Sequence, residues 1–268
     1  MQVPGRNFVR NLVARRSLLF QLVRRDFEQR FVGSAIGWVW GIIHPMVLLV
    51  SWYFVFVVCL NSKLDPGEVT QNYALFLFAG MLPWLLFSET VQRSSTSLLD
   101  QANLITKTVF PAEVVPVSIF LSSLVNHAMA VVLAIAAAWV FLNQASPTLL
   151  LLPLYVGLLG LLSVGVGWIV ASLQVYLRDT SQVLSVVLTF WFWLTPIFIP
   201  EDRFPTQVRF LITANPLAYV VRAYREMLLS YRVPRLREIA AVALYAALMF
   251  ALGGLFFRHM KRGFADVL

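Results

Sequence analysis

The sequence predicts an all-α integral membrane protein with six transmembrane helices, an amphipathic interfacial helix before them, and a re-entrant helical hairpin between spans five and six. The first observation is composition: of 268 residues, 59% are hydrophobic and only 13% are charged. A soluble domain is about 45–50% apolar and about one quarter charged. The second is a series of apolar runs of about 20 residues, the length that crosses a bilayer core about 30 Å thick. The third is the position of the arginines, which cluster beside these runs.

Residues 1–33 form the first predicted unit, a cytoplasmic amphipathic segment with seven arginines. From Ser17 onward, apolar residues recur every four positions at Leu19, Val23, Phe27 and Phe31, with charged residues on the other side. This pattern predicts a helix that lies on the membrane surface. A helix packed on a soluble partner is the alternative.

Residues 34–268 form the predicted transmembrane domain. The six expected spans are 35–60, 72–92, 114–142, 149–176, 182–200 and 239–257. Cytoplasmic loops are rich in Lys and Arg, and placing both termini inside puts 13 of the 21 Lys and Arg residues on that side. The sequence therefore predicts a multi-pass protein with both termini in the cytoplasm.

The connection over 201–238 conflicts with that topology, because it carries seven arginines and four acids on the outer side. Its apolar part, "FLITANPLAYVV", has 12 residues with Pro216 in the middle, which is too short to cross. We therefore expect a hairpin in this connection that enters the membrane and returns, with its turn at Asn215 and Pro216. Arg222 and Arg225 are candidate gate residues, and snorkelling at the outer interface is the alternative.

Several kinds of chemistry have no motif here. No G-x-x-x-x-G-K-[ST] stretch occurs, so the chain is not expected to hydrolyse ATP by itself. Three separated histidines and one cysteine, Cys59, supply no metal-ligand spacing, and dispersed carboxylates supply no catalytic pair. The spans also lack a series of ionisable groups for ion coupling. We expect no catalytic residue, no metal, no cofactor bound by this chain and no nucleic-acid partner, with energy supplied by another protein.

Two further sets of side chains are candidates for a transport pathway. Glu89 and Arg93 stand four residues apart in the second span and can pair as a gate lock. Flat aromatic side chains suit the apolar faces of sugar rings, although an ordinary interfacial belt is the alternative. The candidate conduit aromatics are Trp38, Trp40, Trp191 and Trp193.

The loop between spans two and three is a candidate docking handle for an energy-supplying partner. It is short, polar in its first half and bounded by Pro111 and Pro116. We expect a helix from Asp100 to about Thr108 that lies along the membrane. The side chains it would present are Asn103, Leu104, Lys107 and Phe110.

Several stretches resemble one known family, in order and spacing from about Arg24 to Leu268. They are "RFVGSAIGWVWGIIHP", "FLFAGMLPWLLFSETVQRSSTSLLDQANLITKTVFPAEVVPVS", "VYLRDTSQVL", "TPIFIP", "NPLAYVVRAYREML" and "RGFADVL". The family is the permease subunits of bacterial polysaccharide ABC exporters, which export O-antigen or teichoic acid. His44 departs from the pattern, where Asn before the proline is more usual.

The resemblance implies a permease homodimer in the bacterial inner membrane, paired with two separate ATPase subunits that hold ATP and Mg. It implies a cargo of polysaccharide linked to undecaprenyl diphosphate, with O-antigen as the first candidate. It also implies that residues 100–110 are the coupling helix and that 205–230 are gate helices. We expect the diphosphate to meet Arg24, Arg25 and Arg30, because a doubly charged head needs cationic donors at the interface.

Other functions remain open at this level. Wall teichoic acid or capsule export would use the same architecture. A drug or small-lipid exporter of similar build is a further alternative. A membrane-embedded enzyme that transfers a lipid-linked sugar would need clustered carboxylates or basic residues at one face, and the sequence shows no such cluster.

Overall fold

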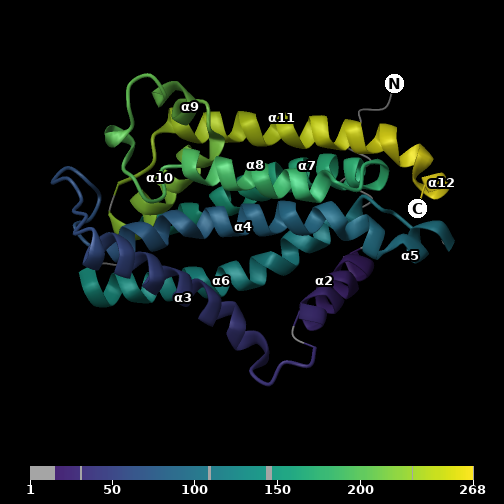
Figure 1. Ribbon diagram of the computed structural model, residues 1–268, viewed down its shortest axis with the longest axis horizontal. Helices are drawn as coiled ribbons and strands as arrows, with labels where there is room; N and C mark the ends of the chain where they lie inside the picture. The colour runs from purple at the N-terminus through teal and green to yellow at the C-terminus, as the bar shows by residue number, and fades with distance from the viewer. Residues whose placement is uncertain (1–15, 31, 108–109, 143–146, 231, 268) are drawn as a thin grey trace.

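The computed structural model describes residues 16–30, 32–107, 110–142, 147–230 and 232–267, and all regular structure in these ranges is helical (Figure 1). The α-helices are α2 (Arg16–Arg30), α3 (Trp40–Tyr53), α4 (Tyr73–Asp100), α5 (Ala102–Lys107), α6 (Val114–Leu142), α7 (Leu152–Tyr176), α8 (Thr180–Leu194), α9 (Arg209–Thr213), α10 (Pro216–Leu229), α11 (Leu236–Met260) and α12 (Phe264–Val267). Short 3-10 or π turns are η1 (Gly37–Val39), η2 (Phe54–Cys59), η3 (Pro147–Leu151), η4 (Glu201–Arg203) and η5 (Lys261–Gly263).

Five helical segments in the described part are long and apolar enough to cross a membrane: Gly37–Cys59, Tyr73–Asp100, Val114–Leu142, Pro147–Tyr176 and Leu236–Gly263. They correspond to predicted spans one to four and six. Two of them are longer than predicted, because α4 continues to Asp100 and α11 begins at Leu236. The chain is therefore a multi-pass membrane protein.

The fifth predicted span, 182–200, is helical only in part. Helix α8 stops at Leu194 after 15 residues, and Thr195 is extended. The cause is Pro196, because a residue before proline is disfavoured in the α conformation. Residues 195–200 continue without helix, so α8 alone is shorter than the roughly 20 residues a span needs.

Helix α4 forms the centre of the bundle. Most of its residues are buried, and it packs against α6, α7 and α10. Helix α7 also packs along α11, where a Cβ added at Gly253 would lie 2.1 Å from the carbonyl oxygen of Gly165. Small residues allow two membrane helices to approach this closely.

Helices α3 and α8 lie at the margin of the bundle. None of the α3 residues is buried, and α8 buries only Leu184 and Leu188. In Figure 1, the N-terminal part of α3 diverges from α4 and α6. Helix α2, which precedes α3 in the chain, lies closer to the bundle. Helix α2 packs against α6, with Leu22 buried in the contact. A helix is thus present where the amphipathic helix was predicted, and it docks on the bundle, while its place on the membrane surface stays a prediction.

The two ends of the molecule carry different elements. Helices α2, α5 and α12 lie toward one end, and α9, α10 and the loop between η2 and α4 lie at the other (Figure 1). The short helix α5 contacts α12 and the end of α4.

Candidate functional site

A network of four charged side chains joins α2 to α4. Arg30 Nη1 lies 2.5 Å from Glu89 Oε1, and Arg93 Nη2 donates to Asp26 Oδ1 at 2.5 Å. The contacts within each helix are longer, 3.5 Å for Arg30 with Asp26 and 3.8 Å for Arg93 with Glu89. The predicted Glu89–Arg93 pair is therefore part of a cluster of two acids and two arginines. Glu89 and Arg93 each lie closer to a partner on α2 than to each other.

Asp26 is the member that sequence reasoning missed. Burial raises the pKa of its carboxyl, but the hydrogen bond and charge of Arg93 and the charge of Arg30 outweigh burial, so its pKa lies below the ordinary value. The only signal in the sequence was its spacing of four residues from Arg30 on the same helix.

A pocket of about 650 Å³ opens beside this network, between α3, α4, α6 and α8. Its lining combines polar side chains with apolar ones, and Trp40 is among the latter. The polar lining side chains are Arg30, His44, Ser88, Glu89, Gln92, Ser123, Asn126, His127, Ser185 and Thr189. Most ligand pockets have this size and this mixture of apolar surface with a few placed polar groups.

Hydrogen bonds order most of these polar side chains. Arg30 donates to Ser123 Oγ at 2.9 Å, and Ser123 donates to Glu89 Oε1 at 3.0 Å. The ring of His127 shares a hydrogen bond of 3.0 Å with the hydroxyl of Tyr224 on α10. Asn126 Oδ1 is different, because it is buried and accepts no hydrogen bond from the protein.

The three predicted diphosphate arginines occupy different environments. Arg24 is exposed and pairs with Glu28 at 2.7 Å. Arg25 is exposed. Arg30 lines the pocket and is already engaged by Glu89, Asp26 and Ser123.

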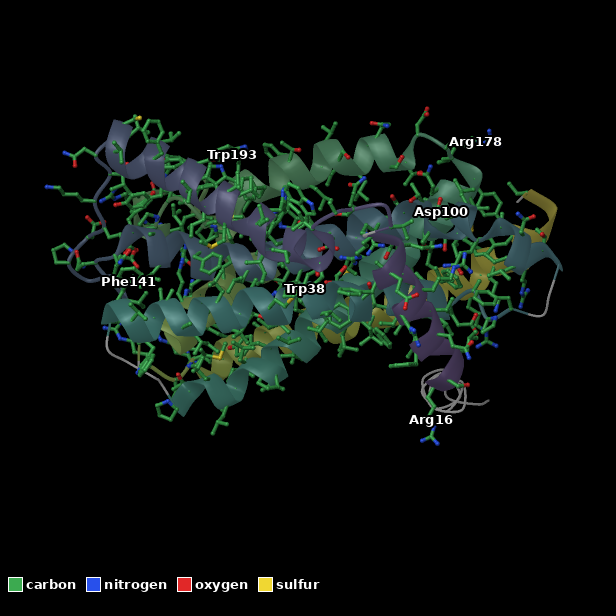
Figure 2. All side chains as sticks on the ribbon, turned by 90° about the horizontal axis from the view of Figure 1, so that it is seen from below. Arg16, Trp38, Asp100, Phe141, Arg178 and Trp193 are labelled. Atoms are coloured by element: carbon green, nitrogen blue, oxygen red, sulfur yellow. The ribbon has the colours of Figure 1, made fainter. Side chains whose placement is uncertain are left out.

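The four candidate conduit tryptophans do not line one pocket within the chain. Trp40 lines the pocket described above, whereas Trp38 lines a second, apolar groove of about 620 Å³ between the start of α3 and α6. Trp191 is half-buried and donates to Asn215 Oδ1 at 2.9 Å. Trp193 is 55% exposed on the outer side of α8 (Figure 2).

The predicted coupling segment forms the end of α4 and the six-residue helix α5. Asp100 and Asn103 are exposed, while Leu104 and Phe110 are half-buried. The side chain of Lys107 and residues 108–109 lie outside the described part of the chain. The exposed polar positions leave the outer face of α5 accessible.

The predicted turn at Asn215 and Pro216 is the start of α10. Asn215 caps the helix by accepting from the Leu217 amide at 3.0 Å, and Pro216 takes the first helical position, where its missing N–H costs nothing. Asn215 also donates to Thr195 Oγ1 at 3.1 Å. This one side chain therefore ties the start of α10 to the end of α8.

The two predicted gate arginines hold the 195–203 segment. Arg225 is 6% exposed and donates to the carbonyl oxygens of Phe76, Pro196 and Ile197 at 3.2, 2.7 and 2.6 Å. Arg222 pairs with Glu201 of η4 and lies 2.6 Å from Glu238 of α11. Both predicted gate arginines thus have partners within the described part of the chain.

The acid partners at this end were not singled out from the sequence. Besides Glu201 and Glu238, Asp65 in the loop before α4 pairs with Arg203 at 3.0 Å. The hydrogen bond from Arg203, with its charge, lowers the pKa of Asp65. Only the folded chain shows this pair, because 138 residues separate the two side chains.

Comparison with known proteins is consistent with this arrangement. The family model described as "ABC-2 type transporter" matches residues 17–229. An O-antigen export system permease protein of Myxococcus xanthus, RfbA, is 26% identical over 260 residues, 96% of this chain and 98% of the relative. A Klebsiella pneumoniae protein of the same name is 27% identical over 252 residues, 94% and 95% of the two chains. The polysialic acid transport protein KpsM of Escherichia coli is 25% identical over 207 residues, 76% and 78% of the two chains.

The family match covers most of the chain, from α2 through the end of α10, and so includes the charged network, the pocket and the 195–230 connection. The five apolar helices agree with a membrane-embedded member. The chain belongs to the ABC-2 type transporter family.

Proposed function

We propose that this chain is the membrane subunit of an ATP-driven exporter that moves a polysaccharide from the cytoplasm across the inner membrane, with O-antigen as the first candidate. The observation that carries the proposal is similarity over nearly the whole chain to proteins named as O-antigen export permeases. The pocket supports a sugar cargo, because its lining combines Trp40 with polar side chains.

In this proposal two copies of the chain assemble with two ATPase subunits, which hold the ATP and Mg. The segment from Asp100 to Phe110 receives the movement of the ATPases, because its outer face carries exposed polar residues at one end of the bundle. Helices α3 and α8, which bury little within one chain, face lipid or the second copy. Trp38, Trp40, Trp191 and Trp193 remain the candidate aromatics along the polymer path.

The proposed topology has six spans and both termini in the cytoplasm. Helix α8 is completed as a span by residues 195–200, which Arg225 fixes through their backbone carbonyls. Helices α9 and α10 form a re-entrant hairpin on the outer side. Satisfied carbonyls next to a broken helix support this arrangement, because irregular backbone at membrane depth needs protein partners.

The cargo is proposed to carry undecaprenyl diphosphate as its lipid anchor. Arg24 and Arg25 are exposed on α2 and offer cationic donors to the diphosphate at the cytoplasmic surface. Arg30 can join them only by releasing Glu89, which pairs with it at 2.5 Å.

Deletion of the gene tests the proposal in the cell. The deletion strain should make the polymer but accumulate it in the cytoplasm, and a plasmid copy should restore it to the surface. Immunodetection of polymer in intact and permeabilised cells measures both pools. If the deletion instead stops polymer synthesis, the chain is an enzyme of assembly and the exporter proposal fails.

Capsule export is the second candidate. Its support is the similarity to the E. coli polysialic acid transport protein. The match covers a smaller share of both chains than the O-antigen relatives do, so we place it second. Identification of the polymer that accumulates in the deletion strain separates the two.

A further inference from the structure

We infer that the C-terminal brace, formed by η5 and α12 (residues 261–267), positions α5 for docking of the ATPase subunit. The inference rests on the proposed function and deepens it, because it adds a second segment, distant in sequence, to the docking region. Three observations carry it: the shortness of α5, the contact of α12 with α5, and an ion pair that ties η5 to the connection between α5 and α6.

Helix α5 depends on its neighbours for its position. It has only six residues, and isolated helices shorter than about 12–15 residues are marginal in water. Its side chain Ile105 packs against the buried core, whereas Asn103 and Thr106 are exposed. The exposed face that a partner would meet is therefore oriented by whatever packs against the other face.

Helix α12 supplies such a contact. It packs against both α5 and α7, and Figure 1 shows α5 and α12 at the same end of the molecule. Its first residue, Phe264, is 1% exposed, and its ring lies 5.5 Å from that of Phe257 on α11 and 6.2 Å from that of Tyr176 on α7. A buried aromatic ring contributes a large apolar area. Phe264 thus anchors α12 to the bundle beside α5.

An ion pair ties η5 to the chain that leaves α5. Lys261 Nζ lies 2.5 Å from Glu113 Oε2, and both side chains are partly exposed. Glu113 lies in the connection between α5 and α6, and its carbonyl oxygen accepts a hydrogen bond of 3.0 Å from Nε1 of the buried Trp168 on α7. The pair therefore joins η5 to a backbone position that α7 already holds.

The end of α11 is fixed to α7 as well. The hydroxyl of Tyr176 donates to the carbonyl oxygen of Met260 at 2.9 Å, directly before η5. The support of α5 thus extends through the brace to α7 and α11, the two helices that approach closely at Gly165 and Gly253. A displacement of α5 by a docked ATPase would reach these helices in addition to α4.

Amide hydrogen exchange of α5 tests the brace without the partner. In Lys261→Glu, a like charge faces Glu113, and we expect exchange of the full chain in lipid nanodiscs to rise about twofold to fivefold at residues 102–107. Adding Glu113→Lys restores an opposite pair and should return the exchange to the wild-type rate. Arg237→Glu is the matched control, because it makes the same charge change at an exposed position in the first turn of α11.

The affinity of the purified ATPase subunit for the same nanodiscs tests the docking role. Phe264→Ala removes a buried ring and should weaken binding at least about tenfold, because only the fraction of molecules with α5 in position binds. Phe264→Leu keeps a large apolar side chain and should weaken binding about threefold or less. Lys261→Glu should weaken binding about twofold to fivefold, and the charge swap should restore it.

Three results would overturn the inference: α5 exchange that stays at the Arg237→Glu rate in both Lys261→Glu and Phe264→Ala, faster α5 exchange with unchanged ATPase affinity, or a charge swap that restores neither quantity. The swap decides even where Phe264→Ala does not fold, because Lys261 and Glu113 are partly exposed. Polymer export is measured separately in the cell. Loss of the inference leaves the exporter proposal standing, whereas export that does not depend on the chain removes that proposal.

Discussion

Arg225 shows how one side chain can organise a broken helix. Its guanidinium lies 3.5 Å from the centre of the Phe76 ring and donates to three backbone carbonyls, two of them in the segment after α8. The carbonyls of Pro196 and Ile197 lie beyond the end of helix α8 and therefore have no helical partner. Since buried carbonyls need donors, Arg225 replaces part of the missing helical hydrogen bonding. Its fork of N–H groups suits this task better than the single ammonium of lysine.

Arg225→Met should therefore destabilise the chain strongly. The substitution leaves the carbonyls of Pro196 and Ile197 without their donor, and the loss should be about 3 kcal/mol or more, since each hydrogen bond to a charged group contributes about 1.5–3 kcal/mol. A fall in the thermal unfolding midpoint of the detergent-solubilised protein measures it. Arg237→Met, at an exposed position in the first turn of α11, is the control and should change the midpoint little.

Asp26 gives the α2–α4 network a defined dependence on pH. Its pKa is lowered in the folded chain, so its contribution to stability is present above its unfolded pKa of about 4 and is lost as the pH falls through the folded value. Asp26→Asn removes the charge at all pH values. The stability difference between wild type and this variant should be constant from pH 5 to 7 and should shrink as the pH falls below the unfolded pKa of about 4.

Thermal unfolding of both proteins across that range is the measurement. A difference that persists unchanged at the acidic end would mean that the carboxylate charge does not stabilise the docked α2.

For the helices, hydropathy predicted some boundaries closely and failed where a single residue ends the helix. Helix α6 begins and ends at the predicted residues 114 and 142, because its apolar run is uninterrupted. Helix α8 was predicted to reach residue 200, since residues 195–200 are mostly apolar, but backbone sterics at Pro196 end it earlier. Hydropathy measures transfer to lipid and carries no information on backbone conformation.

The contact of α7 with α11 depends on glycine. A Cβ on Gly253 would lie 2.1–2.9 Å from the O, C and Cα atoms of Gly165. These are backbone atoms and cannot rotate away. Gly253→Ala should force the helices apart and lower the unfolding midpoint by several degrees, with an overpacking cost of about 1–3 kcal/mol.

Gly157→Ala is the matched control on α7, because a Cβ there meets nothing within 4 Å. It should leave the midpoint unchanged or raise it, since alanine favours helix. Equal midpoints for the two variants would contradict the close approach of α7 and α11.

The short helix α5 carries the proposed docking function. Asn103 is exposed there, and a larger charged side chain should obstruct a partner without disturbing the core. Asn103→Arg should reduce co-purification of the ATPase subunit about tenfold. Gln207→Arg, exposed between η4 and α9, introduces the same side chain far along the sequence and should leave it unchanged. Equal recovery of the ATPase with both variants would remove α5 from the docking surface.

For the whole molecule, the sequence predicted class and order of elements but not which helix is central. All the predicted spans are apolar, yet α4 is largely buried and α3 is not. The difference comes from packing between helices far apart in the sequence. Likewise, the spacing of Glu89 and Arg93 predicted a local pair, whereas their closest partners lie on α2, 59 and 67 residues earlier. Composition and periodicity report local preference, and these contacts are non-local.

The whole molecule also shows why the arginine-rich 201–238 connection does not require a different topology. Part of its charge is compensated within the fold, with Arg222 between Glu201 and Glu238 and Arg203 on Asp65. In the proposed topology this connection lies on the outer side, and the larger positive excess lies on the cytoplasmic side.

In the proposed function, this chain forms the path by which a polysaccharide crosses the inner membrane at the expense of ATP. The most direct measurement uses inside-out vesicles that contain the chain and its ATPase, with labelled lipid-linked polymer supplied outside. Polymer should become protected from an added glycosidase only when ATP and the chain are both present. If the ATPase is bound and hydrolyses ATP but the polymer stays fully accessible, the chain is not the polysaccharide path.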